Sequence, residues 1–548
     1  MRYAEHVSTK VTPQSEAVPG KGMVPNSASG FGFAVDDWVR LDRFLILGSE
    51  GGSYYATERA LTQENAGAVV RCAQADGVET VRRIVAVSHS GRAPKNDPAI
   101  FALALTAANG DALTKKAAYA ALPAVCRTGT HLFQFAAASD ALRGWGRGLR
   151  QAVAEWYSSK SHRDLAYQLT KYQQRDGWAH RDLLRLAHPK TDDAIRNHLL
   201  GWAVGKTRED FAGTIAANAD LAPLYAFEAA KRATSADEVA KLIRDYRLVR
   251  ECVPTQYLAS AMVWEALLVD MPLTAMLRNI ATMTRVGLLA PGAEAVKTVV
   301  AALTDADRLA KARVHPLALL VALKTYAQGK SVRGAGKWVP IREIVDALDA
   351  AFYLAFKSIE PTGKRWMLAL DVSGSMDSGA IAGLPGITPR VGSAAMALVT
   401  AAVEKDFQFV AFTADGWGKR TSLWGMSPAS ALTPLTISPR QRLDDVVTKV
   451  GQLPMGGTDC ALPMVYAAEE KIPVDAFVIY TDNETWAGTI HPFQALKQYR
   501  EKMGIPAKLI VVGMVANEFT IADPSDAGML DVVGFDTSAP GVIADFAR

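Results

Sequence analysis

The sequence predicts a multidomain protein in which a module of α-helical repeats is followed by a doubly wound α/β domain. The chain has 548 residues, and a single hydrophobic core stops growing at roughly 250 to 300 residues. Residues 35–360 carry a helical pattern almost throughout, whereas residues 361–548 alternate short apolar strands with helices. We therefore expect a flexible tail over residues 1–34, a helical module over residues 35–360 and an α/β domain over residues 361–548.

Composition and the N-terminal stretch predict a globular protein of the cytoplasm. Apolar residues make up 49% and charged residues 21% of the chain, as in ordinary soluble proteins, and no apolar run approaches the length of a membrane-spanning helix. Residues 1–34 are polar and lack the apolar region of a secretory signal, so we expect a flexible tail there. The four cysteines are isolated, without a CxxC pair. This pattern predicts reduced thiols in a core and disfavours a disulfide framework and a zinc site.

The helical module is predicted from Ala- and Leu-rich segments that Gly, Pro and Asn interrupt. Examples are residues 111–126, 235–250 and 314–329. In the second of these, Ser235 stands three residues before Glu238, which is the capping-box spacing. Many short amphipathic helices without intervening strands are typical of stacked helix pairs, so we expect an α-solenoid or a ring.

The α/β domain is predicted from apolar runs too short for helices. The expected elements are, in chain order, a strand at 365–374, a helix at 391–406, a strand at 407–415, a helix at 461–471, and strands at 474–483 and 507–517. Buried strands that alternate with helices indicate a parallel sheet covered on both faces. In such sheets, ligands bind at the carboxyl ends of the strands.

Oxygen-bearing side chains cluster in three predicted loops of this domain. DVSGSM follows the first strand and places a carboxylate and two hydroxyls on alternate residues, which in an extended loop point the same way. GGTDC supplies a threonine, and YTDNE supplies an aspartate after a later strand. The five candidate metal ligands are Asp371, Ser373, Ser375, Thr458 and Asp482. We interpret the neighbouring Asp377 and Asp459 as loop or capping residues.

These elements resemble the metal-ion-dependent adhesion site of von Willebrand factor A domains. The resemblance implies that Asp371, Ser373 and Ser375 bind the ion directly, that Thr458 binds directly or through water, and that Asp482 often binds through water. Few carboxylates and several hydroxyls suit a hard octahedral ion such as Mg²⁺, and the weakly charged cage leaves the ion free to accept a partner's carboxylate. The alternative is a serine-rich turn with a capping aspartate, but the three-part match favours the metal site.

Charge is distributed unequally between the two predicted parts. Residues 1–360 hold 45 Lys and Arg against 36 Asp and Glu, a net charge of +9, whereas residues 361–548 hold 15 against 20, a net charge of −5. A basic half suggests a polyanionic partner, and an acidic half suggests a cation. Within the basic half, residues 143–190 combine ten Lys or Arg with only four Asp or Glu and interleaved Trp and Tyr. This composition is typical of surfaces that contact phosphates and stack on bases.

Helical spacing selects candidate RNA contacts from this region. Lys171 and Arg175 are spaced i, i+4, and Arg181, Arg185 and His188 are spaced i, i+4, i+7, so we expect each set to share one helix face. Pro189 is expected to end the second helix and to leave His188 at its C-terminal end, where the helix dipole favours the charged imidazolium. The alternative is a solvated helix face whose aromatic residues serve the core.

Four segments of the helical module resemble the TROVE module of Ro autoantigens: residues 43–55, 126–135, 170–190 and 271–280. In the C-terminal half, GGTDCALP, TDNETW and FTIADPSDAGMLDVVGFD resemble the A domain of the same proteins. The resemblance covers residues 35 to 547, and TROVE followed by an A domain is a distinctive pairing. It implies a ring of HEAT-like helical repeats closed by the A domain.

The same resemblance implies RNA binding. In the family, small structured Y RNAs bind the outer surface, and single-stranded 3′ ends of misfolded noncoding RNAs enter a basic central hole. Lys171, Arg175 and His188 match positions implicated in Y RNA binding, and Gln173 stands where relatives often have a further lysine, which weakens RNA affinity or shifts its register. From spacing and charge we add four further candidates: His180, Arg181, Arg185 and Lys190.

The leading hypothesis is a non-enzymatic RNA-binding scaffold that acts in RNA quality control, decay or maturation. The alternative is a metal-dependent protein-binding module without RNA function. A metal-dependent nuclease is disfavoured, because two-metal nucleases need a denser carboxylate set. The Ala-rich composition is compatible with a bacterial source, and bacterial Ro proteins cooperate with 3′ exoribonucleases such as polynucleotide phosphorylase. The resemblance therefore implies such a partner, and we expect a monomer apart from RNA and protein partners.

Overall fold

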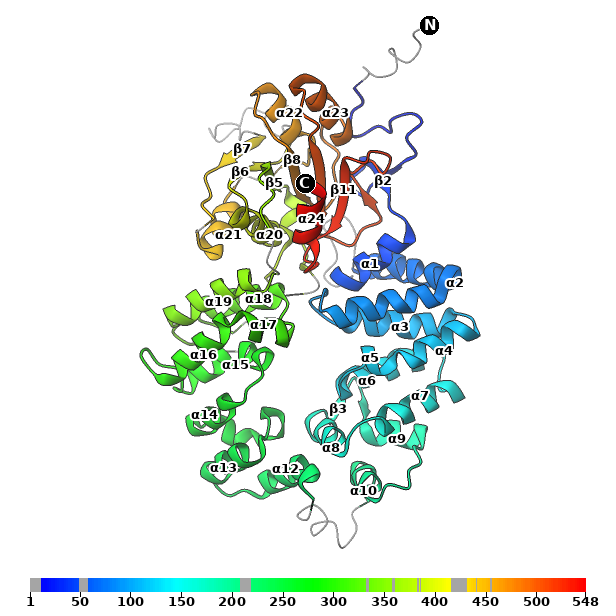
Figure 1. The fold of residues 1–548 in the computed structure, drawn as a ribbon, viewed down its shortest axis with the longest axis vertical. Coiled ribbons are helices and arrows are strands. Elements are labelled where there is room, and N and C mark those ends of the chain that lie inside the picture. Colours follow the sequence, from blue (N-terminus) through cyan, green and yellow to red (C-terminus); the bar gives the residue numbers. More distant parts are fainter. Residues whose placement is uncertain are drawn as a thin grey trace. The chain divides into compact units, whose positions relative to one another are not determined.

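The chain forms two compact units, each described by itself below (Figure 1). The computed structural model describes residues 11–48, 58–206, 218–331, 335–356, 360–381, 384, 386–414, 431–439, 441–453 and 456–548. The helical unit comprises Val69–Gly91 and Lys95–Ala355. The α/β unit comprises the chain up to Ala68, Arg92–Pro94 and Phe356–Arg548. Among the described residues, no helix combines the length and the apolar character needed to cross a membrane.

The described residues of the helical unit form α-helices, most of them short, together with a two-stranded hairpin and 3₁₀ turns. The first helix, α2 (Glu58–Ser90), contains the first boundary between the units and is followed by α3 (Asp97–Asn109), α4 (Ala112–Ala120), α5 (Leu122–Val125), α6 (Gly129–Leu142), α7 (Arg147–Ser158) and α8 (His162–Lys171). Next come the hairpin β3 (Gln174–Arg175) and β4 (Trp178–Ala179), α9 (His180–Ala187), α10 (Ala194–Ala203), η1 (Ala219–Leu221), α12 (Ala222–Arg232), α13 (Ala236–Tyr246), η2 (Arg250–Cys252) and η3 (Thr255–Ala259). The last helices are α14 (Ala261–Val269), α15 (Leu273–Arg285), α16 (Glu294–Thr304), α17 (Ala306–Ala312), α18 (Pro316–Ala327) and α19 (Arg342–Leu354).

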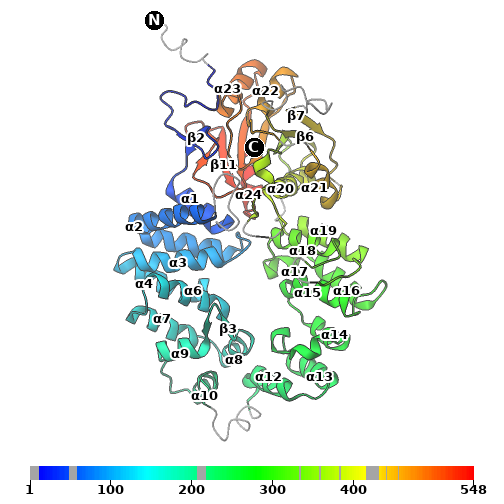
Figure 2. The ribbon, with the colours of Figure 1, turned by 180° about the vertical axis from the view of Figure 1, so that it is seen from behind.

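Each helix of this unit packs against helices close to it in the chain. Helix α3 contacts α4 and α6, α4 contacts α7, and α7 contacts α9. Helix α8 contacts α10 and α12, and the stack continues through α13, α14, α15, α18 and α19, as Figures 1 and 2 show from two sides. Stacking lets every amphipathic helix bury its apolar face on a neighbour. The predicted array of stacked helices is therefore confirmed.

Local capping behaves largely as the sequence predicts. The Ser235 Oγ accepts a hydrogen bond of 3.2 Å from the backbone N–H of Glu238 at the start of α13. The Glu238 carboxylate accepts from the backbone N–H of Thr234 at 2.9 Å, one residue before the cap, where a strict capping box would use the N–H of Ser235 itself. The cap is confirmed, and the second half of the motif is shifted by one residue.

A six-stranded sheet forms the centre of the α/β unit. Its strand order is β11 (Met529–Val533), β9 (Lys508–Gly513), β8 (Ala476–Thr481), β5 (Arg365–Asp371), β6 (Asp406–Phe412) and β7 (Leu432–Leu435). All neighbours are parallel except β6 and β7. The chain leaves β5 towards β6 on one side and later returns to β8 on the other, so the order reverses at β5 and β8. Such a switch point is where doubly wound sheets bind ligands.

Helices cover both faces of this sheet, as predicted. They are α20 (Pro389–Val403), α21 (Leu443–Gly451), α22 (Leu462–Glu469), α23 (Pro492–Met503) and α24 (Ala539–Ala547). On one face, Met367 and Phe477 pack in a cluster with Met464 of α22 and Leu496 of α23. The alternate residues of β5 face the other way, where α20 contacts β5 and β8. Both faces of the strands are therefore apolar, which explains their uninterrupted hydrophobic runs.

The N-terminal part of the chain differs from the expected flexible tail. Strands β1 (Met23–Pro25) and β2 (Phe31–Ala34) pair with β10 (Phe519–Thr520) in a three-stranded sheet. Helix α1 (Asp37–Leu47) belongs to the α/β unit, where the fully buried Arg43 forms an ion pair of 2.7 Å with Asp531. Residues 11–48 thus pack on a domain that begins more than three hundred residues later in the chain, and no local pattern encodes such a contact. Residues 1–10 and 49–57 lie outside the described residues.

Candidate functional site

The five candidate metal ligands converge at one edge of the large sheet. Asp371 is the last residue of β5, and Asp482 directly follows β8. These two strands are parallel neighbours, with Leu370 opposite Tyr480, so their carboxyl ends meet at the same edge. Thr458 comes from the loop before α22. All five side chains are buried, with at most 3% of their surface exposed.

Hydrogen bonds fix the carboxylate and hydroxyl groups of the first loop. Asp371 Oδ1 accepts from the backbone N–H of Ser373 at 2.9 Å, and Asp371 Oδ2 accepts from the Thr481 hydroxyl at 2.7 Å. The hydroxyls of Ser373 and Ser375 lie 3.1 Å apart. The spacing of two that the motif carries thus brings these side chains to one point.

Two buried oxygens at this point have no hydrogen-bond partner among the residues that the structure describes. They are Thr458 Oγ1 and Asp482 Oδ2, while Asp482 Oδ1 accepts from the backbone N–H of Glu484 at 3.0 Å. A buried oxygen without a partner costs free energy that a cation would offset. The donor set, two carboxylates and three hydroxyls, fits a hard divalent ion. Among the described residues, no cluster of three or more His, Cys, Asp or Glu offers a competing metal site.

Electrostatics at this edge of the sheet also favour a bound cation. Burial and the nearby Asp371 charge raise the pKa of Asp482 to about 7. Burial likewise raises the pKa of Asp371, against hydrogen bonds from Ser373 and Thr481 that lower it. Burial and the Asp482 charge raise the pKa of Glu484 to about 8. A divalent ion would reverse this tendency, because it stabilises the charged carboxylates.

Sequence reasoning missed three residues that complete this site. Thr481 holds Asp371, Glu484 stands beside Asp482, and Arg390 of α20 donates to the Val372 carbonyl at 2.6 Å. The signal for Thr481 and Glu484 was available, since both flank Asp482 in the motif TDNE. Nothing in the local sequence around Arg390 connects it with the DVSGSM loop.

The two neighbouring aspartates have other partners. Asp377 lies 3.3 Å from Arg390 in an ion pair. Asp459 Oδ1 accepts from the backbone N–H of Ala461 at 3.0 Å and from the Gln14 amide at 2.7 Å. These contacts are those of loop and capping residues.

The first pair of RNA candidates does not share a helix. Helix α8 ends at Lys171, and Arg175 lies in the hairpin strand β3. The expectation of one helix face for this pair is therefore wrong, because the chain turns into the β3–β4 hairpin before a further helical turn can form. The Lys171 ammonium donates to the Tyr167 hydroxyl at 2.7 Å and lies 5.2 Å from the Tyr172 ring centre. Arg175 is exposed, 3.3 Å from the exposed carboxylate of Asp176.

The second set is divided between surface and core. Arg181 and Arg185 are exposed on α9, and His188 and Lys190 are exposed just beyond its end. His188 caps the helix in the left-handed conformation, with a φ of 47°. His180 in contrast is buried, with its Nδ1 2.7 Å from the Tyr157 hydroxyl and its Nε2 3.3 Å from the Gln168 carbonyl. The prediction that His180 contacts RNA is wrong, because its ring is enclosed in the core.

Two of the aromatic residues also belong to the core. Trp156 and Tyr157 are fully buried, and the Trp156 indole N–H donates to the Cys126 carbonyl at 2.6 Å. These rings cannot stack on bases. Trp145 and Trp178 are half-buried and lie against each other, with ring centres 5.5 Å apart.

A basic groove lies between α9 and α10. Its volume is about 650 Å³, and eleven residues line it: Leu184, Arg185, His188, Pro189, Lys190, Asn197, His198, Leu200, Gly201, Val204 and Lys206. None of these described lining residues is an aspartate or glutamate, so the cationic side chains are not neutralised within the groove. Three of the predicted residues, Arg185, His188 and Lys190, thus meet at one surface feature.

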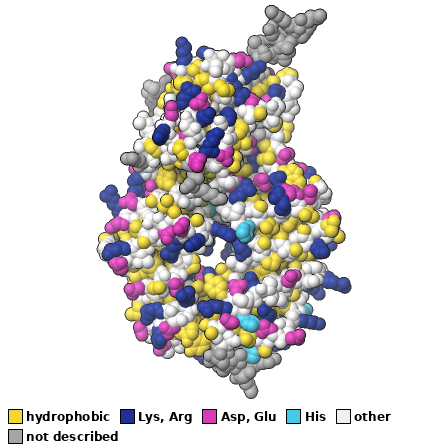
Figure 3. Space-filling model, in the orientation of Figure 1, with side chains coloured by type: hydrophobic (Ala, Val, Ile, Leu, Met, Phe, Trp, Pro, Cys, Tyr) yellow, Lys and Arg dark blue, Asp and Glu magenta, His cyan; other side chains and the backbone are white. Residues whose placement is uncertain are grey.

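Sequence reasoning missed the wall of the groove that α10 supplies. Asn197 and Gly201 are spaced i, i+4 on α10, and Lys206 follows that helix. The periodicity of α10 could have indicated this face, but only the packing of α10 on α9 brings it opposite Arg185. On the face of the molecule in Figure 3, Lys and Arg are interspersed with Asp and Glu. Net charge alone therefore does not locate an interface.

Comparisons with known proteins agree with this architecture. The TROVE domain matches residues 24–325, and the Ro60 vWA domain matches residues 365–547. The chain is 44% identical to the RNA-binding protein RO60 of Deinococcus radiodurans, over 98% of this chain and 97% of that protein. It is 37% identical to the RNA-binding protein RO60 of Caenorhabditis elegans, over 98% and 92%.

A solved structure supports the same assignment. The crystal structure of the Deinococcus radiodurans RO (RSR) protein matches with a TM-score of 0.69 at 44% identity, and covers 94% of this chain and 99% of that one. The TROVE match precedes the Ro60 vWA match in the chain. The chain therefore belongs to the Ro60 family, with a TROVE domain followed by a Ro60-type von Willebrand factor A domain.

Proposed function

We propose that this protein binds RNA through its helical unit and is not an enzyme. The observation in this chain that carries the proposal is the basic groove between α9 and α10. Support comes also from the two relatives, both of which are named RNA-binding proteins.

The groove has the chemistry of a phosphate-binding surface. Arg185, Lys190 and Lys206 provide cations, and His188 and Asn197 provide further hydrogen-bond donors. The apolar residues on its walls, among them Leu184 and Leu200, leave a low-dielectric surface that strengthens the attraction for a polyanion. Because no carboxylate stands among the described residues that line the groove, an RNA backbone would meet no like charge from them.

The finer function follows from the family. We propose that the RNA partners are small Y-like RNAs and the single-stranded 3′ ends of misfolded or precursor noncoding RNAs, and that the protein acts in RNA quality control, decay or maturation. Lys171, Arg175 and His188, at positions implicated in Y RNA binding in the family, support this assignment. A 3′ exoribonuclease such as polynucleotide phosphorylase is the proposed protein partner. All four cysteines are buried and outside any disulfide, which suits the reducing cytoplasm.

We propose that the site at the carboxyl end of β5 and β8 holds Mg²⁺. Asp371, Ser373 and Ser375 would bind the ion, with Thr458 and Asp482 binding directly or through water. Support for this assignment comes from the buried oxygens of Thr458 and Asp482, which have no partner in the described part of the chain. When bound, the ion would supply a Lewis-acidic position that can accept a carboxylate from a partner protein. The same chemistry supports the alternative of a metal-dependent protein-binding module.

RNA affinity measured against salt concentration tests the RNA proposal. Arg185→Ala/Lys206→Ala should flatten the dependence of log affinity on log salt by roughly one and a half to two units, because two phosphate contacts no longer release counterions. The probe is a structured RNA stem with a single-stranded 3′ end. The control is Lys297→Ala/Arg342→Ala, which removes two exposed cations that already pair with Glu294 and Asp346.

Three outcomes are distinguished. An unchanged slope for the control and a flatter slope for the groove variant support the proposal. If the groove variant binds RNA with the affinity and slope of the unaltered protein, the groove is not the RNA site. If neither the unaltered protein nor the control binds RNA, the RNA proposal is wrong and the protein-binding alternative is left.

A further inference from the structure

Residues 12–30, called here the N-terminal segment, lie against two of the three loops that form the candidate metal site. Gln14 is fully buried. Its amide Nε2 donates to Asp459 Oδ1 at 2.7 Å and to the Ile490 carbonyl at 2.8 Å. Its Oε1 accepts from the Thr485 hydroxyl and, at 3.3 Å, from the backbone N–H of Gly488. One side chain therefore joins the loop that carries Thr458 to the loop that follows Asp482.

Asn26 makes a second link from the same segment. Its Nδ2 donates to the Thr485 carbonyl at 2.7 Å, and its Oδ1 accepts from the backbone N–H of Gly30 at 2.7 Å. The backbone N–H of Ala28 donates to Glu484 Oε2 at 3.1 Å. The approach is close, since a Cβ atom at Gly30 would lie 1.9 Å from the Thr485 carbonyl oxygen. Only glycine fits at that position.

Residues 484–487 transmit these links to the candidate ligands. The backbone N–H groups of Trp486 and Ala487 donate to the Thr458 carbonyl at 3.1 and 3.0 Å. The Thr485 hydroxyl accepts from the backbone N–H of Cys460 at 3.1 Å. On the other side, the backbone N–H of Glu484 donates to Asp482 Oδ1, two residues earlier in the chain. The N-terminal segment thus holds a short stretch of chain that in turn holds Thr458 and Asp482.

We propose that the N-terminal segment is a positioning element of the metal site, and that Gln14 and Asn26 are its positioning residues. The proposal rests on the Mg²⁺ site proposed above. Thr458 Oγ1 and Asp482 Oδ2 have no protein partner among the described residues, so their positions depend on the backbone that carries them. Mg²⁺ demands near-ideal octahedral geometry at roughly 2.0 to 2.1 Å. A shift of a few tenths of an ångström in either loop is therefore enough to weaken the binding of the ion.

Calorimetric titration of the full-length protein with Mg²⁺ tests this role. Gln14→Ala should weaken Mg²⁺ binding about ten-fold, the lower end of the effect of removing a group bonded directly to a ligand, because Gln14 acts on the ligands through Asp459 and Thr485. Asn26→Ala should also weaken Mg²⁺ binding. It replaces Gln14→Ala as the test variant if circular dichroism shows that Gln14→Ala does not fold. The melting temperature is recorded with EDTA and with Mg²⁺, so that a loss of stability is separated from a loss of metal affinity.

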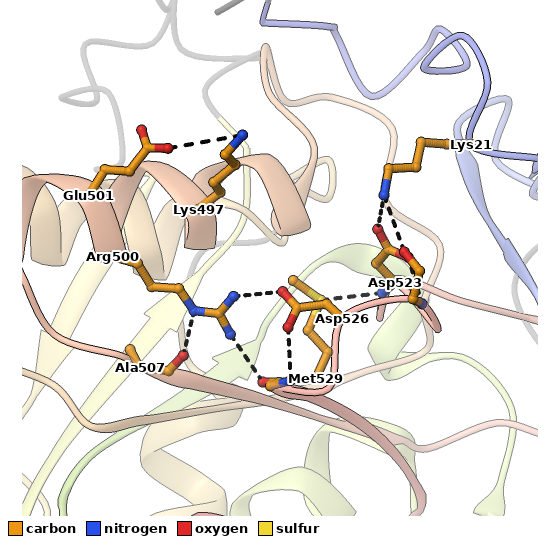
Figure 4. A network of polar contacts seen from close by, with 10 residues as sticks. Lys21, Lys497, Arg500, Glu501, Ala507, Asp523, Asp526 and Met529 are labelled. Atoms are coloured by element: carbon orange, nitrogen blue, oxygen red, sulfur yellow. Dashed lines mark hydrogen bonds and ion pairs between the residues drawn. The ribbon is translucent and has the colours of Figure 1, made fainter. Parts of the chain in front are cut away.

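Lys21→Ala is the matched control. Lys21 belongs to the same segment, but its ammonium pairs with Asp523 at 2.6 Å and contacts Ser525, and neither residue is a candidate ligand (Figure 4). This variant should keep the Mg²⁺ affinity and the Mg²⁺-dependent rise in melting temperature. If Gln14→Ala and Asn26→Ala lower the melting temperature in EDTA yet bind Mg²⁺ as the unaltered protein does, the segment has a structural role only and the proposal is wrong. A failure of the unaltered protein to bind Mg²⁺ would instead refute the metal site itself.

Discussion

At the scale of single residues, burial decides which of two similar side chains is accessible to a ligand. His180 and His188 stand eight positions apart in one basic stretch, yet His180 lies in the core and His188 lines the groove. Burial lowers the pKa of His180 to about 4. Its hydrogen bonds with Tyr157 and Gln168 then hold a neutral ring in place. The same residue type thus serves stability at one position and is available to a ligand at the other.

The lowered pKa of His180 predicts acid sensitivity. In the unfolded chain the imidazole titrates near its ordinary value of about 6.5, so between pH 6.5 and 4 the unfolded state binds more protons than the folded state. Stability is therefore fully present above pH 6.5 and falls as the pH is lowered towards 4, by roughly 3 kcal/mol at most from this residue. Urea unfolding should give a lower free energy of unfolding at pH 5 than at pH 7.5. In His180→Gln, the difference in this free energy between the two pH values should be smaller. His89→Gln, which replaces an exposed histidine, controls for the substitution. An equal pH dependence in His180→Gln and the unaltered protein would contradict the assignment.

Asp371 is predicted to be essential for metal binding and dispensable for RNA binding. Asp371→Ala removes the carboxylate at the end of β5, so Mg²⁺ titration should give no measurable binding, while RNA affinity should stay within about two-fold of the unaltered protein. Asp406→Ala removes an exposed carboxylate from the opposite end of the sheet and should leave both affinities unchanged. Mg²⁺ binding that survives Asp371→Ala would remove the basis for the ligand assignment.

At the scale of secondary-structure elements, caps and turns determine where side chains emerge. Helix α8 ends at Lys171, and the β3–β4 hairpin carries Arg175 away from the face that a longer helix would have given it. Helix α9 ends at His188 because this residue adopts the left-handed conformation directly before Pro189. The end of α9, rather than its middle, consequently contributes most to the groove.

The N-terminal cap of α13 provides a prediction at this scale. Ser235→Ala removes the hydroxyl that accepts from the N–H of Glu238, so the free energy of unfolding should fall by about 1 kcal/mol. Ser158→Ala is the control, because the Ser158 hydroxyl bonds only to the Ala154 carbonyl within α7. Denaturant midpoints measure both effects. A loss of equal size in the two variants would show that the cap contributes nothing specific.

At the scale of the whole molecule, opposite charges separate the two proposed tasks. The half up to residue 360 has a net charge of +9 and contains the groove, whereas the half from residue 361 has a net charge of −5 and contains the carboxylate site. The proposed RNA groove and the proposed Mg²⁺ site thus lie in parts of the chain with opposite net charge. The arrangement suits a scaffold that holds RNA with one part and a protein partner with the other.

A purified sample with Mg²⁺ should leave both single-stranded and structured RNA intact over hours. The metal site has two candidate carboxylate ligands, Asp371 and Asp482, and a second metal ion would need more. Gel analysis of end-labelled RNA measures the outcome. Cleavage that persists through purification and disappears in Asp371→Ala would make the protein a nuclease and overturn the scaffold proposal.

Local features of the sequence determined the fold class, the positions of the elements and the metal-site motif. Helical periodicity, short apolar strands and the Ser235 cap each depend on residues a few positions apart, and the structure follows them. The DVSGSM motif is local for the same reason, because a spacing of two residues in extended chain points its oxygen-bearing side chains to the same side.

Contacts between distant parts of the chain were decided only by the tertiary structure. Gln14 reaches Asp459 across 445 positions, and Asn26 reaches Thr485 across 459. Such pairs leave no periodic trace, so residues 11–34 looked like a polar tail. The burial of His180 and the meeting of Lys206 with Arg185 depend likewise on how one helix packs on another. Side-chain type and spacing define what a residue can do, whereas packing decides which residues are exposed to do it.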